Sequence, residues 1–347
     1  MIQEKSYPDT RFNKACRCQP VDRPPVWIMR QAGRYLPLYQ ELRAKYSFLE
    51  VCQQPELAAK ATLDAANYLD TDAAIIFSDI MIPALGMGLG LDFIPGPKLD
   101  RPVREKADVA RIKLVDPKRD LPFVLEAIKL TRAGLPTEKS LIGFVGAPLT
   151  LCGYLIEGGP TKSWTHFKKM LYGNPKLFEE LMENVTESII RHARAQVEAG
   201  CDAIQLFDSN AGQVAPAELK RFAFHYAQKV VAALKPLGVP VIYFARDIGA
   251  HFEAATEVGA DVLGVDWSIS LNAVHQRVGG NIALMGNLDP TILFTTPNEV
   301  EARTRAILDE ARDLPGFIFN LGHGILPGTP PENAVALIKT VQSHRPQ

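Results

Sequence analysis

Short apolar runs bounded by polar residues recur along the chain and alternate with segments of helical spacing. Runs of this length are typical of strands that are buried on both faces of a parallel sheet. They lie at 72–79, 141–145, 202–208, 240–244, 261–266, 281–285 and 316–320. Helical spacing is expected over 41–69, 123–131 and 175–199, the last with Asn174 as its N-cap and Gly200 at its end. This alternation indicates βαβ units.

The number of such units favours a closed barrel over an open sheet. Seven strands are clear, and the eighth is either 26–29 or 91–94, which the sequence leaves open. No Gly-x-Gly-x-x-Gly or Walker-type loop follows the first strand, as it usually does in a nucleotide-binding open sheet. We therefore predict an α/β protein with a single (β/α)8, TIM-type barrel over 25–347. Residues 1–24 are polar and without periodicity, which predicts an extended N-terminal arm.

Charge and cysteine content exclude several classes of protein. The 347 residues include 38 basic and 39 acidic side chains, so no overall field attracts nucleic acid or an anionic membrane. The 5 cysteines are scattered, unlike those of a disulfide-stapled secreted domain, and none has a partner at zinc-ligand spacing. The N-terminus lacks the apolar core of a signal peptide, and no apolar run is long enough to span a bilayer. We expect a cytoplasmic protein without a membrane span.

Polar residues collect just after the predicted strands, where parallel α/β folds bind their ligands. Asp79 ends the first strand, although by itself an acid there more often caps the following helix. We expect His323, which stands between two glycines, to belong to the site rather than to be inert. The same edge should carry Ser78, Tyr154, Asp208, Ser209, Arg246, Asp247, Asp266, Asn287 and Asp289. No nucleophile elbow and no pair of metal-ligating histidines accompanies them.

One segment near the N-terminus carries two arginines in a distinctive context. In the sequence from Met29 to Pro37, MRQAGRYLP, Gly33 and Pro37 favour a loop or a single turn over a long helix. This segment resembles the uroporphyrinogen decarboxylase family. The resemblance continues in family order to the C-terminal region, with FSDI at 77–80, GFVGAPLTL at 143–151, Tyr154 with EG at 157–158, QLFDS at 205–209, GVDW at 264–267, GNLDP at 286–290 and NLGHG at 320–324.

The resemblance implies a lyase that acts on a tetrapyrrole. Its reaction would be decarboxylation of the four acetate side chains of uroporphyrinogen III to methyls, giving coproporphyrinogen III in heme and porphyrin biosynthesis. It also implies a distorted barrel, a homodimer, and neither cofactor nor metal. The matching site residues are Arg30, Arg34, Asp79, Tyr154, Phe207, Ser209 and His323. Arg43 matches a further substrate arginine, in less similar surroundings.

Each of these side chains has a role under that implied chemistry. Protonation of a pyrrole ring carbon makes the ring an electron sink, and Asp79 would accept the pyrrole N–H groups and stabilise the cation. Arginines suit the substrate carboxylates because a guanidinium forms two parallel charge-assisted hydrogen bonds. Tyr154, Ser209 and His323 would position the acidic arms, while Phe207 lines the cleft. Arg30 is favoured as the proton donor, with His323 and water as alternatives.

Departures from the family pattern leave two alternatives open. Leu38 and Gln40 replace an acid and a base, and Arg246-Asp247 replaces a more usual Lys-Gly. One alternative is a related barrel methyltransferase of corrinoid chemistry, which would need zinc-binding cysteines, whereas no cysteine follows Cys201. The other is a tetrapyrrole-binding protein that has lost turnover.

Overall fold

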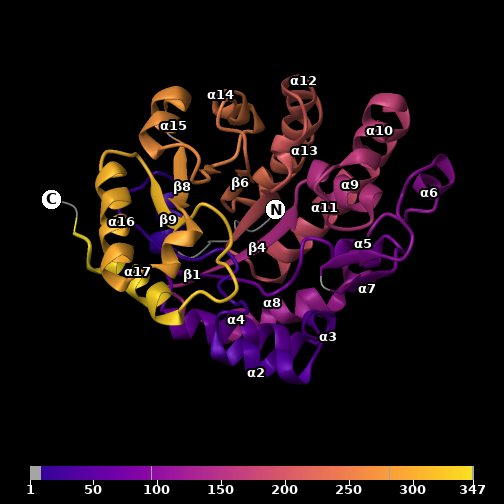
Figure 1. Cartoon of the computed structure of the whole chain (residues 1–347). Coiled ribbons are helices and arrows are strands. Elements are labelled where there is room, and N and C mark those ends of the chain that lie inside the picture. The colour runs from indigo at the N-terminus through magenta and orange to yellow at the C-terminus, as the bar shows by residue number, and fades with distance from the viewer. Residues whose placement is uncertain (1–8, 95, 281, 346–347) are drawn as a thin grey trace.

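A parallel sheet surrounded by helices forms the body of the protein (Figure 1). The computed structural model describes residues 9–94, 96–280 and 282–345. The seven strands of the sheet are adjacent in chain order and are β1 (Ala73–Ile75), β4 (Ser140–Gly146), β5 (Ala203–Asp208), β6 (Val241–Ala245), β7 (Val262–Gly264), β8 (Ala283–Leu288) and β9 (Phe317–Leu321). Every pairing between them is parallel, which confirms the predicted βαβ architecture.

The eighth position of the barrel is occupied by residues 25–27. The Phe319 N–H donates to the Pro25 carbonyl at 2.8 Å, and the Trp27 N–H donates to the Phe319 carbonyl at 3.3 Å. On the other side, the Asp72 N–H donates to the Val26 carbonyl at 2.9 Å. This segment therefore bridges β9 and the start of β1, which decides between the two candidates for the eighth strand. The other candidate, β2 (Leu91–Phe93), pairs with β3 (Pro97–Leu99) in a separate antiparallel hairpin.

Helices follow the strands and cover the outside of the sheet. The α-helices are α1 (Arg11–Cys16), α2 (Pro37–Lys45), α3 (Phe48–Gln53), α4 (Pro55–Leu69), α5 (Pro83–Gly86), α6 (Lys106–Ala110), α7 (Pro117–Asp120), α8 (Pro122–Gly134), α9 (Pro148–Glu157), α10 (Thr165–Gly173), α11 (Pro175–Ala199), α12 (Pro216–Glu218), α13 (His225–Leu234), α14 (Phe252–Ala255), α15 (Leu271–Val278), α16 (Pro297–Glu310) and α17 (Pro331–Ser343). Short 3-10 or π turns are η1 (Ala211–Gln213), η2 (Leu219–Phe224), η3 (Lys235–Leu237), η4 (Thr256–Val258) and η5 (Pro290–Phe294). Within the described residues, none of the helices is both long and apolar enough to cross a bilayer.

The helix predictions succeed where the capping signals are strong. The helix expected over 175–199 is α11, whose Asn174 cap accepts the Leu177 N–H. The helix expected over 123–131 lies within α8. The stretch expected to have helical spacing, 41–69, is helical but divided, because it holds part of α2 and all of α3 and α4. Ser47 and Glu50 form a capping box that starts α3, and Pro55 starts α4.

The N-terminal arm is partly helical rather than extended throughout. Residues 1–8 lie outside the described residues, but α1 at 11–16 is a helix whose Phe12, Ala15 and Cys16 are buried. These side chains pack with barrel residues such as Trp27, Ala203 and Ile318. The expectation of an extended arm is therefore wrong for α1, which packs against the barrel core because its few apolar residues share one face.

An almost fully buried carboxylate fastens the segment before the barrel to β1. Asp72 accepts two hydrogen bonds from the Arg23 guanidinium, at 2.8 and 2.9 Å, and one from Arg11 at 2.6 Å. It also accepts the Val26 N–H at 2.9 Å. The Asp72 side chain is 8% exposed and that of Arg23 10% exposed. This cluster fixes the strand-like segment that leads directly to Met29 and Arg30.

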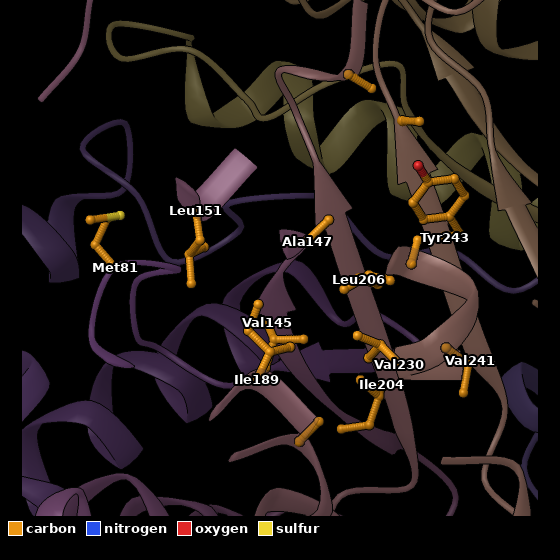
Figure 2. Packing of buried hydrophobic residues seen from close by; sticks show 14 of the residues in the cluster. Met81, Val145, Ala147, Leu151, Ile189, Ile204, Leu206, Val230, Val241 and Tyr243 are labelled. Carbon is orange, nitrogen blue, oxygen red and sulfur yellow. The ribbon is translucent and has the colours of Figure 1, made fainter. Parts of the chain in front are cut away.

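Two apolar layers lie on opposite faces of the strands. One fills the barrel, with alternate residues such as Ile142, Phe207 and Ile242 pointing inward. The other lies between the sheet and the helices, where Val145, Ile204, Leu206 and Val241 face Ile189 of α11 and Val230 of α13 (Figure 2). The first layer ends at the carboxyl ends of the strands in a row of aromatic rings, and these rings border the candidate site.

Candidate active site

Arg30 occupies a backbone conformation that non-glycine residues rarely adopt. Its φ is +67°, in the left-handed region. The segment around it consists of turns, as the sequence predicted. A Cβ added at Gly324 would lie 2.4 Å from Arg30 Cδ and 2.8 Å from its Nε. The Arg30 side chain therefore lies directly over the loop that carries His323, and Gly324 is required for this close approach. A strained, exposed arginine held in this way is typical of a functional site.

Asp79 lies partly buried beyond β1, within the electrostatic reach of Arg30. Burial raises the pKa of the Asp79 carboxyl, while the Met81 N–H and Arg30 act in the opposite direction. The Met81 N–H donates to Asp79 Oδ1 at 2.8 Å. This is a local turn contact and not the helix cap of the alternative, because α5 begins at Pro83 with Ile82 as its N-cap. This contact uses only Oδ1, so the turn leaves the second carboxylate oxygen available to a ligand.

Tyr154 comes from α9 and faces the same charged groups. Burial raises the pKa of the Tyr154 hydroxyl, which Asp79 also raises and which Arg30 and Arg246 lower. The side-chain amide of Asn210 lies beside this hydroxyl and lowers its pKa. Asn210 Nδ2 is buried and has no hydrogen-bond partner among the described residues. The Tyr154 ring packs edge to face on Trp164, with centroids 6.1 Å apart.

His323 is held as a neutral imidazole. Burial, together with the positive charges of Arg30 and Arg246, lowers its pKa to about 3. The ring stacks on Phe244 at 5.9 Å between centroids and 12° between planes. Its Nδ1 is buried and finds no partner in the described part of the chain. A neutral imidazole whose Nδ1 has no protein partner in that part of the chain can form a hydrogen bond with a ligand, but it is a poor acid at neutral pH.

Aromatic rings from neighbouring strands form an apolar border for this site. Phe207 of β5 lies 5.7 Å from Phe144 of β4 and 6.3 Å from Phe244 of β6, centroid to centroid, with edge-to-face geometry in both pairs. Phe207 is 8% exposed. The row continues from Phe244 to His323. Such a surface suits the faces of a large, flat, largely apolar ring system.

The remaining predicted residues lie at the edge of this group. Ser209 follows β5 directly and is partly exposed. Arg34 is exposed, and its charge lowers the pKa of the Tyr39 hydroxyl, against the larger effect of burial. The Tyr39 ring lies 5.4 Å, centroid to centroid, from the ring of Phe77, which is two residues before Asp79. Arg43 donates to the Tyr46 carbonyl and lies over the Phe48 ring, and both of these contacts are structural.

The structure therefore brings Arg30, Asp79, Tyr154 and His323 into one electrostatic group and leaves Arg34 further out. Sequence reasoning gave no site role to Asn210, Phe144 or Phe244. Phe144 and Phe244 had a usable signal, because each faces inward near the end of a strand. Arg246 had been noted only at the strand edge and as a departure, yet its charge acts on both Tyr154 and His323. Asn210 gave no sequence signal.

No group of three or more metal-ligating side chains occurs within residues 9–94, 96–280 and 282–345. One departure from the family pattern, Gln40, lies on α2 and makes a structural contact. Gln40 Nε2 donates to the Arg34 carbonyl at 2.8 Å, so this residue supports the arginine segment.

The fold is shared with solved structures of other chemistry. A methyltransferase from Methanosarcina mazei matches with a TM-score of 0.82 and 23% identity, over 96% of this chain and 97% of that protein. A B12-independent methionine synthase from Shewanella sp. matches with a TM-score of 0.56 and 13% identity, over 93% of this chain and 98% of that protein. At these identities the likeness shows the TIM-type fold alone.

Two relatives found by sequence are more similar to this chain than these solved structures are. Proteins named uroporphyrinogen decarboxylase from Geobacter metallireducens and Geobacter sulfurreducens are each 45% identical to this chain over 333 residues, covering 96% of it and 98% of each relative. The family model described as uroporphyrinogen decarboxylase (URO-D) matches residues 7–344. The motifs noted above fall within this match. The chain belongs to the uroporphyrinogen decarboxylase family.

Proposed function

We propose that this protein decarboxylates uroporphyrinogen III, converting its four acetate side chains to methyls and releasing coproporphyrinogen III. The observation that carries the proposal is the placement of one partly buried carboxylate, Asp79, with Arg30 and Tyr154 at the mouth of an aromatic-lined barrel. Family membership over nearly the whole chain supports the same activity.

The proposed reaction needs an acid and an anion but no external electron carrier. A proton added to the ring carbon next to the one that bears the acetate makes the ring cationic. The bond between the acetate methylene and its carboxylate then breaks, carbon dioxide leaves, and the electron pair neutralises the ring. A second proton adds to the methylene carbon and the first leaves the ring carbon, so the net change is one proton taken up for each carbon dioxide released.

Asp79 would stabilise the cationic ring in this scheme. Its available oxygen would accept pyrrole N–H groups, which would offset the burial that raises its pKa in the free protein. In a cleft of low dielectric, an anion fixed beside a developing cation contributes more than it would in water. The scheme therefore requires Asp79 to be ionised when substrate is bound.

Arg30 is our choice for the residue that delivers the proton at the reacting ring. The pKa of His323 is lowered to about 3, so its protonated form is scarce at neutral pH. An arginine is ordinarily a weak acid, but the charge of Arg30 acts on Asp79, Tyr154 and His323 alike, so its guanidinium would face the reacting ring. His323, Tyr154 and Ser209 would hold the acidic arms, and Arg34 would bind a carboxylate further out.

We also propose a homodimer in the cytoplasm. Trp267, which is 45% exposed, and Phe294, which is 47% exposed, lie on loops that follow β7 and β8 at the same edge as the site. Exposed aromatic rings of this kind are enriched at subunit contacts. Light scattering coupled to size exclusion should give twice the 38.2 kDa chain mass. A mass of one chain would contradict the dimer.

Freshly reduced uroporphyrinogen III under anaerobic conditions tests the activity directly. The expected result is carbon dioxide release and stepwise conversion to coproporphyrinogen III, read as porphyrins after oxidation. Binding without carbon dioxide release would instead identify a tetrapyrrole-binding protein without turnover. Methyl transfer to a corrinoid acceptor, with no decarboxylation, would place the chain with the barrel methyltransferases.

A further inference from the structure

We propose that Asp208, together with Thr150 and Tyr243, is a positioning unit that holds Tyr154 and Ser209 in place for the substrate. This inference rests on the proposed decarboxylation. Asp208 would touch no substrate, because it lies behind the sheet, and it would act through its two neighbours in the cleft.

The side chain of Asp208 points away from the cleft. Asp208 is the last residue of β5 and is fully buried. Phe207, the residue before it, faces the barrel, so Asp208 faces the layer between sheet and helices. There, Thr150 Oγ1 lies 2.6 Å from Asp208 Oδ1, and Tyr243 Oη lies 2.9 Å from Oδ2. Figure 2 shows Tyr243 in this layer, with its hydroxyl directed toward the carboxyl ends of the strands.

The direction of each hydrogen bond is fixed by its neighbours. The Asn210 N–H donates to Thr150 Oγ1 at 3.1 Å. Since the threonine hydroxyl accepts there, its single proton is free to point at Asp208. Tyr243 donates to the other oxygen. Both carboxyl oxygens therefore act as acceptors, an arrangement that suits an ionised Asp208.

This unit is connected to two proposed substrate residues. Thr150 and Tyr154 are both on α9, four residues apart and therefore on the same face of the helix. Ser209 lies between Asp208 and Asn210, whose backbone N–H is fixed by Thr150. The Asn210 amide lies beside the Tyr154 hydroxyl. A shift of the unit would thus move Tyr154 and Ser209 together.

Asp208 should link activity and stability to pH in opposite directions. Burial raises its pKa from 3.8 to about 6, and the side chains that counteract this are Thr150 from α9 and Tyr243 from β6. β4 and α11 also pack on β5, but no charged side chain from them, among the described residues, acts on this pKa. Because the folded pKa is raised, the stabilising contribution of Asp208 is complete below pH 3.8 and is lost as the pH rises through about 6. Activity should instead fall as the pH drops through about 6, because protonation removes an acceptor.

A purely structural network makes a different prediction. It would tie β5, β6 and α9 together, so its loss would lower thermal stability while kcat and KM at permissive temperature stayed unchanged. A positioning unit changes turnover in protein that is fully folded. Displacements of about 1 Å in a catalytic group can cost up to a hundredfold in rate.

Thr150→Val and Thr150→Ser form the decisive pair of variants. Valine keeps the shape of threonine but removes the hydroxyl, whereas serine keeps the hydroxyl. With freshly reduced uroporphyrinogen, we expect Thr150→Val to lose about tenfold or more in kcat/KM. Thr150→Ser should stay within about twofold of the unchanged protein, since its hydroxyl can still join Asn210 to Asp208. A folded Thr150→Val protein with unchanged kcat and KM would overturn the proposal.

Tyr243→Phe provides a second test that does not depend on the first variant folding. It removes one donor that stabilises ionised Asp208, so the acidic limb of the kcat/KM profile should move to higher pH. An unchanged limb would count against the proposal. Turnover measured with the protein that carries no substitution distinguishes a failure of this inference from a failure of the proposed function. If that protein shows no turnover of uroporphyrinogen, the proposed function fails; if it is active and Thr150→Val matches it, only the positioning unit fails.

Discussion

Asp72→Asn is expected to destabilise the protein strongly because it removes a buried charge that four donors share. Asparagine has nearly the shape of aspartate, so the loss is electrostatic rather than one of packing. Arg23 loses both of its hydrogen bonds to a carboxylate, at 2.8 and 2.9 Å, and it is only 10% exposed. Breaking a buried ion pair by removing one partner costs about 3–5 kcal/mol. Arg11 adds less, because it is 29% exposed and also binds Asp22.

Asp22→Asn is the matched control. Asp22 binds Arg11 through two nitrogens, at 2.6 and 2.9 Å, but its side chain is 68% exposed. An exposed pair of this kind is worth about 0–1 kcal/mol. The two substitutions therefore remove similar contacts at different burial, and the structure predicts a difference of about 2–5 kcal/mol in the free energy of unfolding.

Urea unfolding followed by tryptophan fluorescence measures this difference, and amide exchange locates it. The amides of Val26 and Trp27 should lose protection in Asp72→Asn, because the Val26 N–H donates to this carboxylate and the Trp27 N–H pairs with β9. Equal unfolding free energies for the two variants would refute the account of Asp72 as the residue that fixes the start of the barrel.

Three further predictions concern the site. Arg34→Lys should weaken substrate binding by about 1–3 kcal/mol, measured as KM, because lysine keeps the charge but loses the paired hydrogen bonds; unchanged affinity would make Arg34 a structural residue. Gly324→Ala should lower kcat/KM at least tenfold while leaving the melting temperature nearly unchanged, since the new Cβ would lie 2.4 Å from Arg30 Cδ and must displace that exposed side chain; full activity would show that Arg30 need not lie there. Dialysis against a strong chelator should leave turnover unchanged, whereas a loss restored by a divalent metal would contradict the cofactor-free scheme.

The parts of the fold that the sequence predicted correctly carry strong local signals. The helix at 175–199 has a capping asparagine before it and a glycine after it, and the structure reproduces its ends. The strand predicted at 72–79 is paired only over 73–75, because the Phe77 N–H donates to Thr62 Oγ1 of α4 instead of to the sheet. Such a long-range competitor leaves no trace in the local pattern. The strand predicted at 281–285 is β8, although residue 281 lies outside the described residues.

The site residues were predicted largely by resemblance to the family. The features that the sequence did not predict are those that depend on the fold. Asp79 alone favoured a helix cap, but the N-cap of α5 is Ile82, and Asp79 makes only a turn contact with the Met81 N–H. The left-handed conformation of Arg30 and its dependence on Gly324 are long-range features, since these residues are far apart in sequence. The lowered pKa of His323 likewise follows from burial and from the charges of Arg30 and Arg246, which only tertiary structure brings together.

Turnover of Asp79→Asn on uroporphyrinogen is the most direct test of the central claim. Asparagine can still accept the Met81 N–H through its carbonyl oxygen, so the turn and the melting temperature should be preserved. Only the negative charge that faces the cationic ring is lost. We predict a fall in kcat of about a hundredfold or more, with Asp79→Glu retaining more activity than Asp79→Asn. A stable Asp79→Asn protein with full activity would contradict the claim and reduce Asp79 to a residue of the turn.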